Sequence, residues 1–189
     1  MKNKIIAALG NDRLDHRDHI TYPQIYVMDW TQRTSGATGL EIHASKPQNI
    51  PALLIENPNL DITATFFKPH CFIDEDGYEP DNCEGVFYLT DSTDETWVLF
   101  VEIKDCKSKN ISTYYSKTKE QIIKVVAIFR ARNIIAQNKK VYANISFPRS
   151  DKINYYNQLI KNPKEFRDKH KIILRGTNTL RIKNNTSIF

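Results

Sequence analysis

The segment from Thr96 to Cys106, TWVLFVEIKDC, constrains the fold more than any other part of the chain. Apolar side chains stand on both faces of this segment when it is extended, which predicts a strand buried on both sides. Alternation places Glu102 and Lys104 on one face, together with Phe100. Burying an ion costs several kcal/mol unless the ion is paired or bound. The two charges therefore either satisfy each other or serve a chemical purpose.

The length and the charge distribution narrow the class of protein. A chain of 189 residues with 40% hydrophobic content predicts a single domain over 1–189. Residues 72–105 carry eleven acids and one base, whereas residues 139–189 carry twelve bases and three acids. An acidic centre with a basic flank suits a metal-dependent enzyme that acts on a polyanion. Solvated loops and a solvated tail are the alternative interpretation.

The cysteines and the apolar runs indicate the compartment. Three cysteines without framework spacing favour a reducing environment. No apolar run has the length of a secretory or membrane segment, so we expect a cytoplasmic protein with no membrane partner. His70 and the three cysteines lack the paired spacing of zinc ligands, which favours buried or half-buried thiols. The chain has no glycine-rich phosphate loop, which argues against a nucleotide-hydrolysing motor.

The first seventy residues give weak predictions. We expect a short helix over 3–9 that stops at Gly10, a strand over 20–30 and a loop over 34–39. The apolar run over 49–58 fits either a helix or a strand, and 61–73 is expected to be extended.

The remaining residues give a clearer order of elements. Strands over 83–89 and 96–106 have a short polar link, which predicts an antiparallel hairpin. A helix over 113–138 and a strand over 139–147 follow. Further on we expect a helical stretch over 151–170, broken at Pro163, and a terminal hairpin over 171–183 that turns at 176–178. The central order of strand, strand, strand, helix, strand predicts an α/β domain with a mixed central sheet flanked by helices.

Glu102 and Lys104 suit work on a phosphodiester. Glu102 and a second acid from the neighbouring strand would hold a divalent cation, to which the carbonyl of Ile103 would add a ligand. Lys104 would position the attacking water or help to deprotonate it, and would stabilise charge on the phosphorane. The candidates for the second acid are Glu84 and Asp81.

The motifs NCEGVFYL, WVLFVEIKDC and KTKEQIIKV together resemble the PD-(D/E)xK nuclease superfamily, over about residues 62–147. The resemblance implies a restriction-endonuclease-like core with a basic C-terminal helical and hairpin extension over 148–189. It also implies Mg²⁺ or Mn²⁺ as cofactor and hydrolysis of phosphodiester bonds in nucleic acid, by resemblance DNA.

The resemblance assigns roles to particular residues. Glu102, Ile103 and Lys104 match the Glu-x-Lys element, and Gln121 matches a glutamine on the helix that follows. Glu84 stands where the family usually has Asp, and the extra methylene puts catalysis in question.

The resemblance leaves two assignments open. Asp81, after Pro80, is the rival match for the first acid. An additional acid from the N-terminal region would be Glu56 or Glu41.

The basic C-terminal region adds possible partners. Arg175, Arg181 and Lys183 on the predicted hairpin are the expected phosphate contacts. A homodimer or a partner subunit would fit cleavage of both strands of a duplex. The alternatives to a nuclease are a catalytically degenerate nuclease fold that binds nucleic acid or protein, and an interaction subunit whose basic tail docks an acidic partner.

Overall fold

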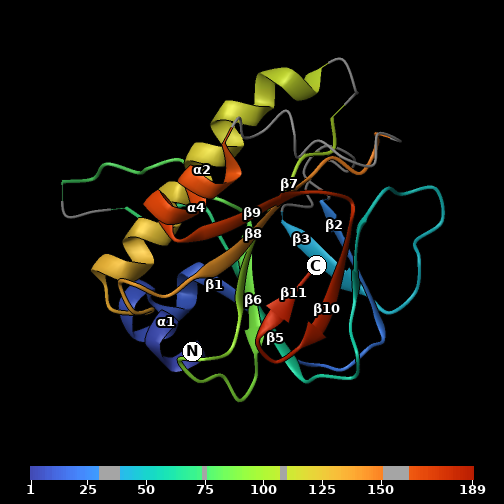
Figure 1. Cartoon of the computed structure of the whole chain (residues 1–189), viewed down its shortest axis with the longest axis horizontal. Helices are drawn as coiled ribbons and strands as arrows, with labels where there is room; N and C mark the ends of the chain where they lie inside the picture. Colours follow the sequence, from blue (N-terminus) through green and yellow to red (C-terminus); the bar gives the residue numbers. More distant parts are fainter. Residues whose placement is uncertain (30–38, 74–75, 107–109, 151–161) are drawn as a thin grey trace.

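The computed structural model describes residues 1–29, 39–73, 76–106, 110–150 and 162–189. These residues form three layers, with helices on one face of a six-stranded sheet and a five-stranded sheet on its other face (Figure 1). The α/β class and the mixed sheet are as predicted. Most of the predicted loop over 34–39 and the predicted helical stretch over 151–161 lie outside the described residues.

The six-stranded sheet contains the predicted central order of elements. Its strands, in spatial order, are β1 (Leu14–Ile20), β5 (Ile62–Phe67), β6 (Gly85–Leu89), β7 (Val98–Ile103), β8 (Val141–Ser146) and β9 (Ile172–Gly176). Neighbours from β1 to β7 are antiparallel, whereas β7, β8 and β9 run parallel. The β6–β7 hairpin is confirmed, and α2 makes the crossover from β7 to the parallel strand β8.

The five-stranded sheet joins segments from the two ends of the chain. Its spatial order is β11 (Ser187–Ile188), β10 (Thr179–Asn184), β4 (Leu53–Glu56), β2 (Gln24–Asp29) and β3 (Leu40–His43). β10 pairs with β4 in parallel, so the last long strand lies beside a strand from the first third of the sequence. The predicted terminal hairpin is therefore wrong, because β9 and β10 belong to different sheets.

Two apolar cores lie on the two faces of the six-stranded sheet. Val98 and Phe100 of β7 face the helices, whereas Leu99, Val101 and Ile103 face the second sheet. This is the alternation expected of a strand buried on both sides. β7 thus contributes side chains to both cores, as does its neighbour β6 with Val86 and Tyr88 on one face and Phe87 and Leu89 on the other.

The helices cover one face of the six-stranded sheet. They are α1 (Lys2–Leu9), α2 (Ile111–Ala131) and α4 (Pro163–His170), with a short 3₁₀ turn η1 (Asn11–Arg13) after α1. α1 ends at Gly10, as predicted, where φ is 84°. α2 is shorter than the predicted 113–138, because Asn133 adopts a left-handed conformation with φ of 56°. Pro163 begins α4, and proline is well accommodated in the first turn of a helix.

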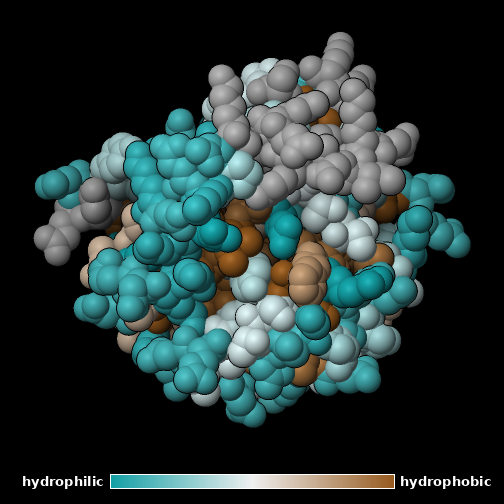
Figure 2. Space-filling view, in the orientation of Figure 1, coloured by the Kyte–Doolittle hydropathy of each residue, from teal (hydrophilic) through white to brown (hydrophobic). Residues whose placement is uncertain are grey.

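Figure 2 shows the surface of the molecule from the same side as Figure 1. On that side, hydrophobic residues gather at the middle, and hydrophilic side chains surround them. Within the described ranges, no helix has the length and apolar character needed to cross a membrane.

Candidate functional site

β6 and β7 bring two acids together at one end of the six-stranded sheet. Gly85 pairs with Val101, so Glu84, the residue before β6, lies opposite Glu102. The backbone N–H of Glu84 donates to Oε2 of Glu102 at 3.1 Å. A Cβ at position 85 would meet the Phe66 ring at 2.7 Å, so glycine allows β5 to approach closely here. Local sheet geometry therefore holds Glu84 beside Glu102.

Lys104 joins the two acids into what we call the buried triad, Glu84, Glu102 and Lys104. The Lys104 Nζ lies 2.9 Å from Oε1 of Glu84 and 2.9 Å from Oε1 of Glu102. The Glu102 side chain is fully buried, and those of Lys104 and Glu84 are 22% and 20% exposed. Glu102 thus lies behind the other two, with Glu84 and Lys104 facing the exterior.

Burial and mutual contact set the charges of the triad. Burial raises the pKa of Glu102 to about 8, with Lys104 opposing and Glu84 adding to the shift. Burial also raises the pKa of Glu84. Burial alone would lower the pKa of Lys104, but the two carboxylates outweigh it and raise that pKa. When all three groups are ionised, the two carboxylates exceed the one ammonium by one negative charge. Binding of a proton or of an added cation would neutralise this buried excess.

A pocket of about 620 Å³ opens beside the triad, and Glu84 and Gln121 both line it. Gln121 of α2 is 7% exposed, and its Nε2 donates to the carbonyl of Asn82 at 2.8 Å. Its Oε1 is buried and accepts no hydrogen bond from the described residues. The structure thus brings Gln121 to the same place as the triad, although nineteen and seventeen positions separate it from Glu102 and Lys104 in the sequence.

The side chains of Asp81 and Ile103 lie outside the triad. Asp81 lines the pocket, but its half-exposed carboxylate forms an ion pair with Lys117 at 3.4 Å. Ile103 ends β7 between Glu102 and Lys104, pairs with Ser146 and packs its side chain into the core between the sheets. Of the two candidates for the first acid, Glu84 is the one in the triad.

A further acid, Asp29, was not recognised in the sequence. It ends β2 in the second sheet, is 5% exposed and pairs with Leu40, which lines the pocket. Burial is the largest cause of the raised pKa of Glu84, and Lys104 acts to lower this pKa. The negative charge of Asp29 is a further cause that raises it. The sequence does contain a signal for this buried acid. In the strand QIYVMD, Asp29 follows Ile25 and Val27 on the apolar face.

The two acids considered from the N-terminal region do not approach the triad. Glu56 forms an ion pair with Arg181 at 2.5 Å, and Glu41 forms one with His43 at 3.1 Å. Both pairs lie in the five-stranded sheet. Neither Glu56 nor Glu41 lines the pocket beside the triad, whereas Asp29 acts on the pKa of Glu84.

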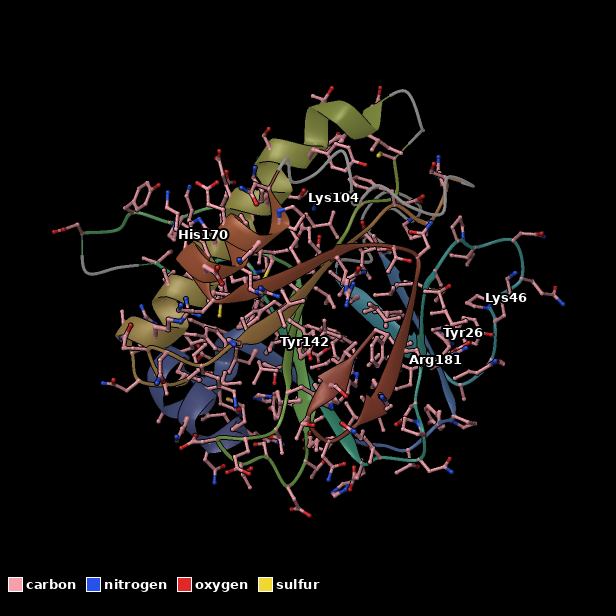
Figure 3. The ribbon with its side chains drawn as sticks, in the orientation of Figure 1. Tyr26, Lys46, Lys104, Tyr142, His170 and Arg181 are labelled. Carbon is pink, nitrogen blue, oxygen red and sulfur yellow. The ribbon has the colours of Figure 1, made fainter. Side chains whose placement is uncertain are left out.

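The expected phosphate contacts do not form one surface. Arg175 is half-buried in β9, whereas Arg181 and Lys183 stand in β10 of the other sheet. Lys183 lies over the Phe189 ring at 5.3 Å from its centroid. Figure 3 shows Arg181 on the five-stranded sheet, well apart from Lys104. The grouping was wrong because it assumed the hairpin, and the role of each residue stays a prediction.

The cysteines are buried free thiols, as expected. Burial raises the pKa of Cys71 to about 12 and also raises the pKa values of Cys83 and Cys106. Across the described ranges, no three His, Cys, Asp or Glu residues are placed to hold a metal ion together. A cation at the triad would therefore have two carboxylates as its charged ligands, and water would complete its coordination, as Mg²⁺ tolerates.

No protein family model matches this chain, and no curated protein and no solved structure is similar enough to it to count as a match.

Proposed function

We propose that this chain is a metal-dependent nuclease with a restriction-endonuclease-like core, acting on phosphodiester bonds in nucleic acid, with DNA as the expected substrate. The observation that carries the proposal is that the triad of Glu84, Glu102 and Lys104 lies beside a pocket that Glu84 and Gln121 line. Glu102 lies in β7, Lys104 directly follows β7, Glu84 directly precedes β6, and Gln121 lies in α2. The order of β5, β6, β7, α2 and β8, with β8 parallel to β7, supports the same proposal.

The donor set fits Mg²⁺ or Mn²⁺. Both cations prefer oxygen ligands, and the carboxylates of Glu84 and Glu102 offer them side by side. Their raised pKa values mean that a cation would compete with protons for the two groups. When bound, the cation would supply a Lewis acid and lower the pKa of a bound water.

The chain's own residues would position the reactants. The Lys104 ammonium keeps its proton, because its pKa is raised, and would stabilise negative charge that develops on the phosphate. The Gln121 Oε1 has no partner among the described residues and would accept a hydrogen bond from the attacking water. Its Nε2 holds the chain at Asn82, two residues before Glu84.

A binding module is the second candidate, and one specific contact favours it. Lys104 bridges both carboxylates at 2.9 Å, so the triad forms a connected structural unit without a metal. In that case the pocket would bind nucleic acid or protein without cutting it.

The test is cleavage of supercoiled plasmid, single-stranded DNA and single-stranded RNA with Mg²⁺ or Mn²⁺, compared with EDTA. Wild type should cut at least one of them, and Lys104→Ala should reduce the rate by at least about 100-fold. Lys46→Ala, an exposed lysine on a different part of the surface (Figure 3), is the matched control.

Metal binding supplies an independent readout. Mn²⁺ should raise the melting temperature of wild type and should raise that of Glu102→Gln much less. Folded wild type that neither binds Mn²⁺ nor cuts any of the three substrates would overturn the nuclease proposal. Salt-dependent binding without cutting would select the second candidate.

A further inference from the structure

A second pocket lies beside the first, on the other side of Pro80, which lines both. It has a volume of about 390 Å³ and is formed between the β5–β6 connection and α2. Figure 1 shows this connection extending past α2 beyond the body of the molecule. Its principal lining residues are Phe72, Tyr78, Pro80, Lys124, Ile128 and Arg132.

The walls of this second pocket suit a flat apolar ring. Phe72 is buried and belongs to the core, whereas Tyr78 is 61% exposed. Among the described residues, three large apolar side chains are exposed, and Tyr78 is the most exposed of them. On the opposite wall, Ile128 of α2 is joined by the small side chains of Ala127 and Ala131. An exposed aromatic ring in a pocket that apolar side chains also line provides a stacking surface.

Basic residues of α2 connect the two pockets. Lys117, Gln121 and Lys124 follow each other at spacings of four and three, so they share one face of the helix. Lys117 contacts Asp81 of the first pocket, and Lys124 lines the second. They are about 10 Å apart along the helix axis. A polyanion leaving the first pocket would therefore meet positive charge on its way to the second.

Arg132 adds a charge at the far rim. Its Nη1 donates to the carbonyl of Ala8 at 3.0 Å, which anchors the guanidinium between α1 and α2. An anchored guanidinium presents its remaining N–H groups in a defined direction, which suits a phosphate.

Resting on the proposed nuclease function, we propose that the second pocket binds one base of single-stranded nucleic acid whose scissile phosphate lies in the first pocket. Tyr78 stacks on the base, and Lys124 and Arg132 contact the flanking phosphates. The charges of the rim complement the phosphates, and Pro80, which lines both pockets, makes them immediate neighbours. A base in a duplex stays stacked on its neighbours and cannot enter such a pocket, so the inference names single strands as the preferred ligand.

The experiment measures binding without cleavage. Fluorescence anisotropy with a labelled 12-nucleotide single strand and with the corresponding duplex, both in EDTA, gives affinities that do not depend on catalysis. Wild type should prefer the single strand. Tyr78→Ala should weaken single-strand binding about tenfold, while Tyr78→Phe, which keeps the ring, should stay within about twofold of wild type.

Matched controls separate the pocket from the general surface. Tyr22→Ala removes another exposed tyrosine and should leave affinity unchanged. Lys124→Ala should reduce the slope of affinity against salt concentration by about one, whereas Lys46→Ala should not. Photocrosslinking of a single strand containing 5-iodouridine, followed by peptide mass spectrometry, should identify Tyr78.

The results also separate this inference from the nuclease proposal. Equal affinities for wild type and Tyr78→Ala, with crosslinks at other residues, would overturn the base pocket even if the plasmid is cut. Binding that depends on Tyr78, in a protein that cuts nothing, would support the pocket and overturn only the catalytic proposal.

Discussion

The buried triad and the exposed ion pair of Glu56 with Arg181 both hold carboxylates against a cation at short distance, but their surroundings differ. The buried triad has N–O distances of 2.9 Å, and the exposed pair of Glu56 with Arg181 has one of 2.5 Å. Arg181 is 71% exposed, whereas Glu102 is fully buried. A short contact therefore does not by itself mark a functional site. Burial and unequal charge distinguish the triad from the pair.

The physical reason is solvation. Water and salt screen the exposed pair, whose charges are equal and opposite. The triad has two acids for one base in a place that water reaches only at Glu84 and Lys104 and not at Glu102. An arrangement of this kind is costly to keep without a ligand, which is why perturbed ionisable groups gather at functional sites.

The largest expected effect comes from removing the cation of the triad. Lys104→Met leaves two adjacent carboxylates with no positive partner and should lower the free energy of unfolding by about 3–5 kcal/mol at pH 8. The loss should be smaller at pH 5, where the carboxyls of Glu84 and Glu102 take up protons. Urea denaturation at the two pH values measures it. A loss of equal size at both would show that the triad is not the cause.

A second prediction concerns how stability changes with pH. The pKa of Glu102 is about 8 in the folded protein, above the ordinary value of 4.5, so folding favours its protonated form. Its contribution to stability is therefore largest at low pH and declines as the pH rises toward 8. Glu102→Gln removes this decline, so the stability of the variant relative to wild type should improve steadily from pH 5 to pH 8. Parallel stability curves for the two proteins would contradict the raised pKa.

The smallest effect is expected at the exposed pair. Arg181→Met should leave the melting temperature unchanged within error at pH 5 and pH 8, because water solvates Glu56 when its partner is removed. The variant also replaces the cation of a carboxylate–cation contact by methionine and is the control for Lys104→Met. A clear loss of stability here would remove the distinction between the two contacts.

Much of the candidate site followed from local patterns. The alternation in β7 correctly separated Phe100 and Glu102 from Val101 and Ile103, and Glu84, directly before the apolar run of the preceding strand β6, was one of the two candidates for the second acid. Gln121 was assigned by the resemblance to the nuclease superfamily, and the structure brings it to the pocket that Glu84 also lines. The predictions about β7 and its neighbouring strand needed only strand periodicity and the pairing of adjacent strands.

Other parts depended on contacts between distant segments. β9 and β10 are separated by two residues and lie in different sheets, because β10 buries Leu180 and Ile182 against the face that β4 also covers. Asp29 approaches Glu84 only because the second sheet packs on the first. No pattern within one segment reveals which distant strand it will join.

The sequence by itself determined the faces of β7, the position of its two charges and the strand, strand, strand, helix, strand order, since each follows from the periodicity of a short continuous stretch. The tertiary structure alone decided that Lys104 contacts both Glu84 and Glu102, that Asp29 lies near them and that Arg175 and Arg181 are in different sheets. Backbone geometry sets periodicity residue by residue, whereas the partners of a buried charge depend on how the whole chain divides its apolar surface between two cores.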